Sequence, residues 1–189
     1  MPHGAKDIAW TGALWHPRAV LPDGLRLRLI EPDDAPRLIA LYDRLSRHTA
    51  YQRFFSAMKR LPPDWAEFLA NVDYQTRLAL VIEHDGPAGR EVMAVARYER
   101  DREPGVAEVA FVVEDGWQGQ GLGRILLREL LAAATARGIR RFRAYVLADN
   151  YRMLRLLSRY TRVLSRSTDA GVTEISFEPP TSTGSGGTT

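Results

Sequence analysis

The residues best suited to chemistry form a glycine-rich turn between an apolar run and a helical pattern. The turn reads Gln118-Gly119-Gln120-Gly121-Leu122-Gly123, and Arg124 opens the helical pattern. Glycines let a backbone approach a ligand closely, and the unpaired amides of a first helical turn point at an anion. This succession of strand, turn and helix therefore predicts a site for a phosphorylated cofactor.

The glycine spacing argues against two common phosphate-binding loops. The dinucleotide fingerprint requires G-x-G-x-x-G and an acidic residue about 20 positions later. Here Gly119, Gly121 and Gly123 are spaced G-x-G-x-G, and the later neighbourhood is the arginine-rich segment 140–143. A nucleoside-triphosphate loop requires Gly-Lys-Ser/Thr, and this turn has no lysine. A different phosphorylated cofactor is therefore expected.

Two charged residues flank the turn. Glu108 lies on the apolar run and, in an extended strand, shares a face with Ala110 and Val112. A carboxylate on such a strand is costly unless it is solvated, paired with an arginine or functional. Arg124 lies in the first helical turn, where a cation is unfavourable for the helix dipole. We therefore expect Arg124 to pair with the cofactor phosphates.

A mixed α/β sheet is expected to position these residues. Alternation and apolar runs predict strands at 25–29, 77–84, 91–99, 106–114, 140–148, 162–167 and 172–178. Helical spacing predicts helices at 33–46, 62–71, 121–137 and 149–159, the last capped by Asp149. Three consecutive strands imply an antiparallel meander, and the strand, helix and strand from 106 to 148 form a parallel crossover.

The chain is expected to be one domain at 23–178, between an N-terminal arm at 1–22 and a disordered polar tail at 179–189. No apolar run approaches the roughly 20 residues of a membrane span, and the N-terminus lacks a signal-peptide layout. These features predict a cytoplasmic protein that does not bind membranes.

Composition excludes several function classes. The chain has no cysteine, and His3, His16, His48 and His84 show no ligand spacing, so neither a thiolate nucleophile nor a metal site is expected. The net charge is only +3, and the densest arginine cluster, at 137–143, marks a helix end. Nucleic-acid binding is not expected, because it favours a basic stripe with interleaved aromatic residues.

The glycine turn resembles the Q/R-x-x-G-x-G/A signature of the GNAT superfamily of acetyl-CoA-dependent N-acetyltransferases, where it follows the fourth strand and opens the next helix. The segment 149–154, DNYRML, resembles a second element of that superfamily. The stretches 33–35, 51–56 and 107–113 are similar to the acetyltransferase domain of bacterial Pat-type protein-lysine acetyltransferases. The resemblance covers about residues 23–178.

The resemblance implies direct transfer of an acetyl group from acetyl-CoA to an amine, with a protein lysine as acceptor and no metal. Glu108 matches the general base that removes a proton from the amine, whose pKa in water is about 10.4 for lysine. A strand amide near Val112 is expected to polarise the thioester oxygen. The implied cofactor residues are Phe111, Val112, Val113, Gln118, Gly119, Gln120, Gly121, Leu122, Gly123, Arg124, Asn150 and Met153.

The chain departs from the family pattern after the helix that Asn150 opens. Pat-type domains usually carry Gly-Phe near the end of this helix, whereas this chain has Thr161-Arg162, which puts the helix end in question. Many superfamily members use a tyrosine to protonate the departing thiolate. Tyr151 and Tyr160 lie in this helix, but their spacing from Asn150 does not match that tyrosine.

The acceptor side is the least determined part of the site. Tyr51, Arg53 and Phe54 are candidates for ordering the acceptor, with core packing as the alternative, and Trp117 is a candidate to flank the cofactor loop. A small-molecule amine acetyltransferase and a non-catalytic CoA-binding sensor both remain open. The sequence also leaves open the acyl-chain length and the oligomeric state, a dimer included.

Overall fold

The computed structural model describes residues 18–87 and 89–180. Most of the predicted arm at 1–22 and of the predicted tail at 179–189 lies outside these residues, as do His3 and His16. Residues 18–22, which belong to the predicted arm, carry no helix or strand.

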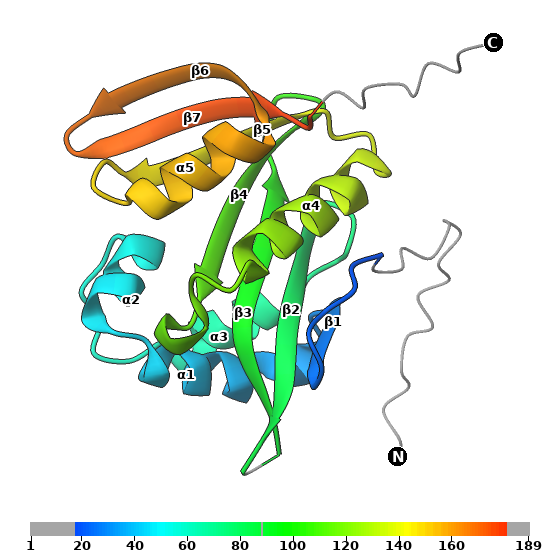
Figure 1. Cartoon of the computed structure of the whole chain (residues 1–189), viewed down its shortest axis with the longest axis vertical. Coiled ribbons are helices and arrows are strands. Elements are labelled where there is room, and N and C mark those ends of the chain that lie inside the picture. The colour runs from blue at the N-terminus through cyan, green and yellow to red at the C-terminus, as the bar shows by residue number, and fades with distance from the viewer. Residues whose placement is uncertain (1–17, 88, 181–189) are drawn as a thin grey trace.

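The described residues form one mixed seven-stranded sheet in the order β1-β2-β3-β4-β5-β7-β6 (Figure 1). The strands are β1 (Leu25–Leu29), β2 (Arg77–Gly86), β3 (Gly89–Arg100), β4 (Val106–Val113), β5 (Arg141–Leu147), β6 (Arg162–Asp169) and β7 (Val172–Glu178). The meander from β1 to β4 is antiparallel, β4 and β5 are parallel, and β7 pairs antiparallel with both β5 and β6. The predicted mixed α/β sheet is therefore confirmed.

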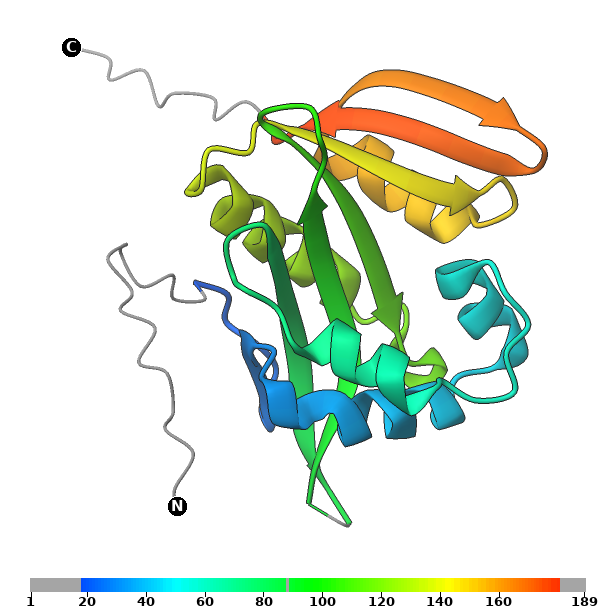
Figure 2. The ribbon, with the colours of Figure 1, turned by 180° about the vertical axis from the view of Figure 1, so that it is seen from behind.

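Helices cover both faces of the sheet. They are α1 (Ala35–Arg44), α2 (Arg47–Phe54), α3 (Pro63–Ala70), α4 (Leu122–Thr135) and α5 (Tyr151–Tyr160), with short 3-10 turns η1 (Pro32–Asp34) and η2 (Asp115–Trp117). Helices α4 and α5 lie over one face and α1 and α3 over the other, as opposite views show (Figures 1 and 2). The leucines of α4 and α5 belong to the core on the first face, and α1 and α3 contribute to the core on the second. The central strands are buried on both sides, which explains their continuous apolar runs.

One helix was not predicted. The expected helix at 33–46 is in fact η1 followed by α1, and α2 follows as a separate helix. Helix α2 buries only Thr49 and Ala50, so it carries no apolar stripe for periodicity to detect. The sequence does contain a start signal for this helix, because serine is a favoured capping residue. The Ser46 side chain caps α2 by accepting a hydrogen bond from the Thr49 amide at 3.1 Å.

Candidate active site

Strands β4 and β5 pair only over their first residues. Parallel pairing joins Val106–Glu108 to Arg141–Arg143 and does not continue along the later residues of the two described strands. Beyond Glu108, β4 stays beside β3 and β5 stays beside β7. The two strands therefore diverge from Glu108 onward, as the view from behind shows (Figure 2).

The divergence exposes alternate backbone amides of β4. The Glu114 amide donates to the Met93 carbonyl at 2.8 Å, so the even-numbered residues of β4 bond to β3. The Val112 amide consequently faces β3, so the predicted amide near Val112 that polarises the thioester would have to belong to a neighbouring residue. By the same alternation the amides of Val109, Phe111 and Val113 face the side from which β5 has diverged.

The glycine turn leads directly into α4. Gly119 and Gly121 have φ values of 80° and 87°, the left-handed region that favours glycine, and Gly121 is the residue before the first turn. A Cβ placed on Gly121 would meet no atom within 4 Å, so the requirement for glycine there is one of backbone conformation. The amides of the first turn have no acceptor within the helix and face the diverging strands.

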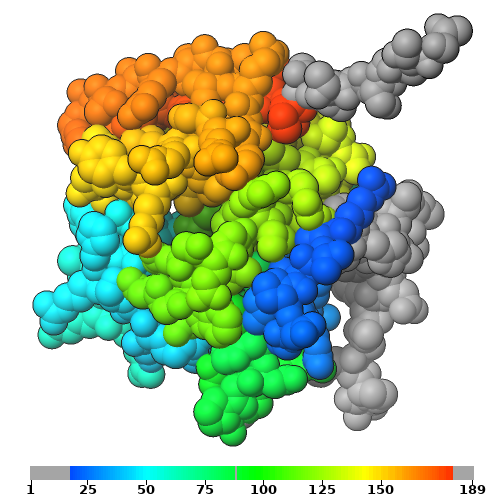
Figure 3. Space-filling view, in the orientation of Figure 1, coloured from blue at the N-terminus to red at the C-terminus, as the bar shows by residue number. Residues whose placement is uncertain are grey.

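A groove of about 1030 Å³ runs between the end of β4, the glycine turn, α2 and α5. Its mouth lies where α2, α4 and α5 meet on the surface (Figure 3). All the predicted cofactor residues line it except Gln120, whose side-chain amide donates to the Gly116 carbonyl at 3.0 Å instead. Trp117 also lines the groove. The cofactor-binding role of these residues stays a prediction.

Gln118 joins three elements around this groove. Its Nε2 donates to the Val113 carbonyl at 3.0 Å and to Thr49 Oγ1 at 3.3 Å, and Arg152 Nη1 donates to its Oε1 at 2.8 Å. Both ends of the amide are thus engaged by the protein. The conformation of the turn is therefore fixed relative to α2 and α5.

Asp115 anchors α2 to the same turn. Its carboxylate accepts hydrogen bonds from the Ser46 amide at 2.9 Å and from the hydroxyls of Ser46 and Thr49 at 2.7 Å each. Burial alone would raise the pKa of Asp115, but these hydrogen bonds outweigh it and hold the pKa below its ordinary value. No local pattern indicates this contact, because the partners lie more than sixty positions apart in the chain.

Arginines surround the mouth of the groove. Arg124 from α4 and Arg152, Arg155 and Arg159 from α5 all line it. The Arg124 guanidinium lies over the Tyr160 ring, with its central carbon 5.0 Å from the ring centroid. Arg124, Arg155 and Arg159 form no ion pair within the described residues, which leaves their charge available to an anionic ligand.

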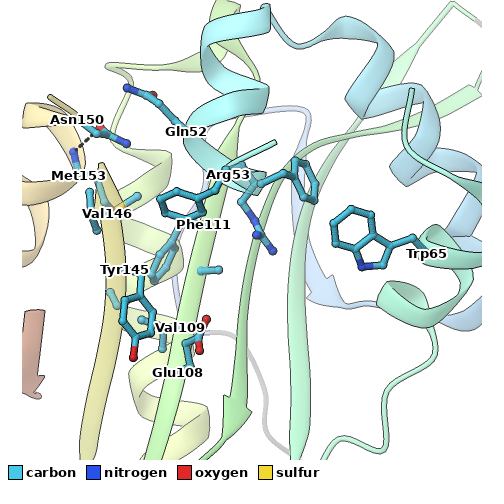
Figure 4. Close-up of a pocket in the computed structure, with 14 residues that line it drawn as sticks. Gln52, Arg53, Trp65, Glu108, Val109, Phe111, Tyr145, Val146, Asn150 and Met153 are labelled. Carbon is cyan, nitrogen blue, oxygen red and sulfur yellow. Dashed lines mark hydrogen bonds between the residues drawn. The ribbon is translucent and has the colours of Figure 1, made fainter. Parts of the chain in front are cut away.

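Helix α5 is capped by Asn150, not by Asp149 as predicted. The Asn150 side-chain oxygen accepts a hydrogen bond from the Met153 amide at 3.2 Å, which fixes the first turn of α5 beside the groove (Figure 4). At its other end the helix finishes normally without glycine. The Thr161 amide and hydroxyl both donate to the Leu157 carbonyl, at 3.1 and 2.7 Å, and β6 starts at the next residue.

Glu108 lies at the point where β4 and β5 part, in a smaller pocket of about 170 Å³ that shares residues with the groove. Its carboxylate makes no hydrogen bond or ion pair with any described residue, so the alternative of a paired strand-start carboxylate is not observed. Partial burial, together with the nearby charges of Glu99 and Asp101, raises the pKa of Glu108. Arg53 and Arg143 oppose that rise.

The three acceptor-side candidates have different surroundings. Phe54 packs between Tyr42 and Trp65, with ring centroids 5.5 and 5.6 Å away, and Tyr51 is exposed. Arg53 projects from the end of α2 toward the face of β4 that carries Glu108 (Figure 4). Burial lowers the pKa of Arg53 to about 10, against the opposing effect of Glu108.

The described residues form neither a cluster of possible metal ligands nor a helix that could span a membrane. No group of three or more His, Asp or Glu side chains in 18–87 and 89–180 could hold a metal ion. His84 instead lies beside Glu91, with Nε2 3.6 Å from a carboxylate oxygen, and His48 lines the groove. None of the described helices is both long enough and apolar enough to cross a membrane.

Comparison with known proteins identifies the family. Residues 37–160 match the model of the acetyltransferase (GNAT) family. The chain is 38% identical over 158 residues to the acetyltransferase Pat of Mycolicibacterium smegmatis, covering 81% of this chain and 46% of that relative. It therefore spans about half the length of that protein. It is also 32% identical over 145 residues to the acetyltransferase PA5475 of Pseudomonas aeruginosa, covering 76% of this chain and 75% of the relative.

Solved structures support the same family. The GNAT domain of S. lividans PAT superimposes with a TM-score of 0.72 at 34% identity, covering 82% of this chain and 90% of that one. The chain belongs to the acetyltransferase (GNAT) family.

Proposed function

We propose that this protein transfers an acetyl group directly from acetyl-CoA to an amine, with a protein lysine as the acceptor. The observation that carries the proposal is the position of Glu108. An unpaired carboxylate with a raised pKa lies where β4 and β5 diverge, between the large groove and an open pocket on the other side of α2. A base placed there can reach an amine that approaches a thioester held between the strands.

The groove suits acetyl-CoA in size and in chemistry. The first-turn amides of α4 and the arginines at the mouth of the groove are hydrogen-bond donors for the pyrophosphate of CoA and for its remaining phosphate group. Phe111, Val113, Met153 and Leu156 provide an apolar wall for the pantetheine arm. A volume of about 1030 Å³ is at the upper end of the range for small-molecule sites, as a cofactor of this length requires.

Acetyl transfer needs a group that accepts a proton from the amine and a hydrogen-bond donor to the carbonyl oxygen of the thioester. Glu108 takes a proton from the acceptor ammonium, directly or through a water, and leaves a neutral amine. The amine nitrogen bonds to the acetyl carbon, the carbon–sulfur bond breaks, and the departing thiolate takes up a proton. A β4 amide on the diverging side, such as that of Phe111, supports the oxygen as it gains charge. Phe111 is next to Val112, near which this amide was expected.

A protein lysine is favoured as acceptor by the openness of the Glu108 side. Trp65 and Phe68 of α3 are exposed beside the pocket that contains Glu108, so a side chain on the surface of another protein can reach the carboxylate. The resemblance of the sequence to Pat-type protein-lysine acetyltransferases favours the same acceptor. A small-molecule amine acetyltransferase and a non-catalytic CoA-binding module are the alternatives.

Thiol release from acetyl-CoA distinguishes these functions. We expect release with a lysine-bearing protein, and none when its lysines are dimethylated beforehand, which also separates transfer from hydrolysis. A panel of small amines is measured alongside. Release confined to the small amines would replace the lysine acceptor with a metabolite. Tight acetyl-CoA binding without release on any acceptor would overturn the proposed transfer.

A further inference from the structure

Arg97 is a buried cation that the protein itself does not satisfy. It lies in the middle of β3, and only 8% of its surface is exposed. Its Nη2 atom is buried without a hydrogen-bond partner, and Arg97 forms no ion pair with any of the described residues. An unpaired buried guanidinium costs several kcal/mol in principle, so its presence calls for an anion from outside the chain.

The side chain of Arg97 lines a pocket of about 530 Å³ on the acceptor side of β4. The register places Arg97 opposite Ala110, and Glu99 opposite Glu108. Arg97 is therefore the diagonal neighbour of Glu108 on one face of the sheet, a distance that a long side chain spans. Arg53, Trp65 and Phe68 complete the walls of this pocket.

Arg53 is a second cation in this pocket without an ion pair among residues 18–87 and 89–180. The two arginines repel each other. Burial, together with the charges of Arg53 and Arg77, lowers the pKa of Arg97 to about 9, against the weaker opposing effect of Glu99. The electrostatic repulsion between these two guanidinium groups would be relieved by a bound anion.

The acidic side chains of the pocket do not supply that anion. Glu99 pairs with Arg77 at 3.7 Å, and Asp101 pairs with Arg143 at 2.8 Å. Glu108 attracts Arg53, but it is not within ion-pair distance of any described cation, and it is the base of the proposed reaction. The pocket therefore keeps an uncompensated positive charge beside the base.

We propose that Arg97 and Arg53 form an anion subsite that binds a carboxylate carried by the acceptor, close to the amine that is acetylated. The inference rests on the proposed function, since it describes the acceptor half of the same site. The carboxylate has two possible sources: the α-carboxylate of a small amino-acid acceptor, or an acidic residue beside the lysine of a protein. Either binds the guanidinium groups through charge-assisted hydrogen bonds.

Matched acceptors test the subsite. Nα-acetyl-lysine is compared with Nα-acetyl-lysinamide, and a lysine peptide with a neighbouring glutamate is compared with the same peptide carrying glutamine. The carboxylate member of at least one pair should have a kcat/KM about tenfold higher or more, mainly through KM. The pair that shows the preference identifies the source. Equal kcat/KM within both pairs would overturn the proposal.

Arg97→Met tests the residue, with Arg166→Met, an exposed arginine on β6, as the matched control. We expect Arg97→Met to lose the carboxylate preference while its melting temperature stays unchanged or rises, because a buried unpaired charge is removed. Arg166→Met should keep the preference. A preference that survives Arg97→Met would overturn the proposal, and so would a marked fall in melting temperature, which would assign Arg97 a structural role.

A binding measurement separates failure of the subsite from failure of the proposed function. The CoA-loaded protein is titrated with Nα-acetyl-lysine and with its amide, and the chemical shifts of backbone amides are followed. Carboxylate-dependent binding that Arg97→Met removes supports the subsite even if no amine is acetylated. Equal binding of the two compounds contradicts the subsite, even if thiol release confirms transfer.

Discussion

At the scale of single residues, some polar side chains of the groove are hydrogen-bonded to other parts of the protein, and others have no such partner in the described part of the chain. The side chain of Gln118 is held at both ends by protein partners, which makes it a positioning residue for the turn. Arg124 forms no ion pair with a described carboxylate and lies only over the Tyr160 ring. Residues such as Gln118 therefore shape the groove, whereas residues such as Arg124 are available to bind the proposed ligand, acetyl-CoA.

Replacing Arg124 tests this distinction. Arg124→Met should weaken CoA binding about tenfold, because a charge-assisted contact to phosphate is lost, while kcat changes little. Calorimetric titration with CoA measures the loss, and S-acetylpantetheine, which has no phosphate, serves as the reference ligand. Arg140→Met, at an exposed arginine before β5, is the control protein. An equal loss for both ligands would show that Arg124 acts on the shape of the groove instead.

The sequence predicted those site residues whose role depends on a local pattern. The glycine turn and Arg124 lie within one short stretch, and Glu108 stood out as a carboxylate in an apolar strand. Asp115 and Arg97 could not be found in this way. Asp115 acts through partners far away in the chain, and Arg97 is unusual only because β2, β4 and α3 bury it.

At the scale of elements, the first turn of α5 is placed by its cap. Asn150→Ala removes the acceptor of the Met153 amide and should destabilise the protein by about 1 kcal/mol, measured by urea unfolding. It should also raise KM for acetyl-CoA, since Asn150 and Met153 line the groove. Asn150→Asp keeps an oxygen acceptor and should retain most of the stability. Equal destabilisation by both changes would contradict a capping role.

The elements were predictable where periodicity is strong and were missed where it is weak. All the strands and the leucine-rich α4 were found within a few residues, most of them because their apolar residues alternate, form a continuous run or repeat with the helical period. Helix α2 is short, mostly polar and held by Asp115, so its position depends on a contact that no local pattern reveals. It is nevertheless the element that brings Arg53 beside Glu108.

At the scale of the whole molecule, a buried ionic cluster joins β1, η1 and β2 on the side away from the groove. Arg28 binds Asp34 and Glu83, and Arg37 also binds Asp34, each at 2.7 Å. Burial alone would raise the pKa of Asp34, but the hydrogen bonds from Arg28, the Glu31 amide and Arg37 hold it below its ordinary value. The carboxylate therefore stabilises the fold in its ionised form.

This cluster predicts how stability depends on pH. Because the folded pKa of Asp34 is lowered, its contribution is complete above the unfolded pKa of about 3.9 and is lost as pH falls through the folded pKa. Asp34→Asn should cost about 3–5 kcal/mol at pH 7 and flatten the acid side of the stability curve. Asp33→Asn, at the exposed neighbour, should do neither. An unchanged acid slope in Asp34→Asn would contradict this assignment.

Within the whole molecule, the sheet divides where β4 and β5 part. The order of elements predicted the meander and the crossover, but not that β4 and β5 pair over only three residues before diverging. That divergence places Glu108 between the large groove and the pocket that Arg97 lines. A proton acceptor at this point is the feature on which the proposed transfer depends.

The pH dependence of acetyl transfer in wild type and Glu108→Gln tests this claim most directly. In wild type, kcat for thiol release should rise with pH through the raised pKa of Glu108, because only the carboxylate accepts the proton. Glu108→Gln should lower kcat by about 10²–10⁴-fold and abolish that rise while acetyl-CoA affinity is retained. Glu67→Gln, at an exposed carboxylate of α3, should behave like wild type. A Glu108→Gln protein that keeps the wild-type kcat and pH profile would contradict the account.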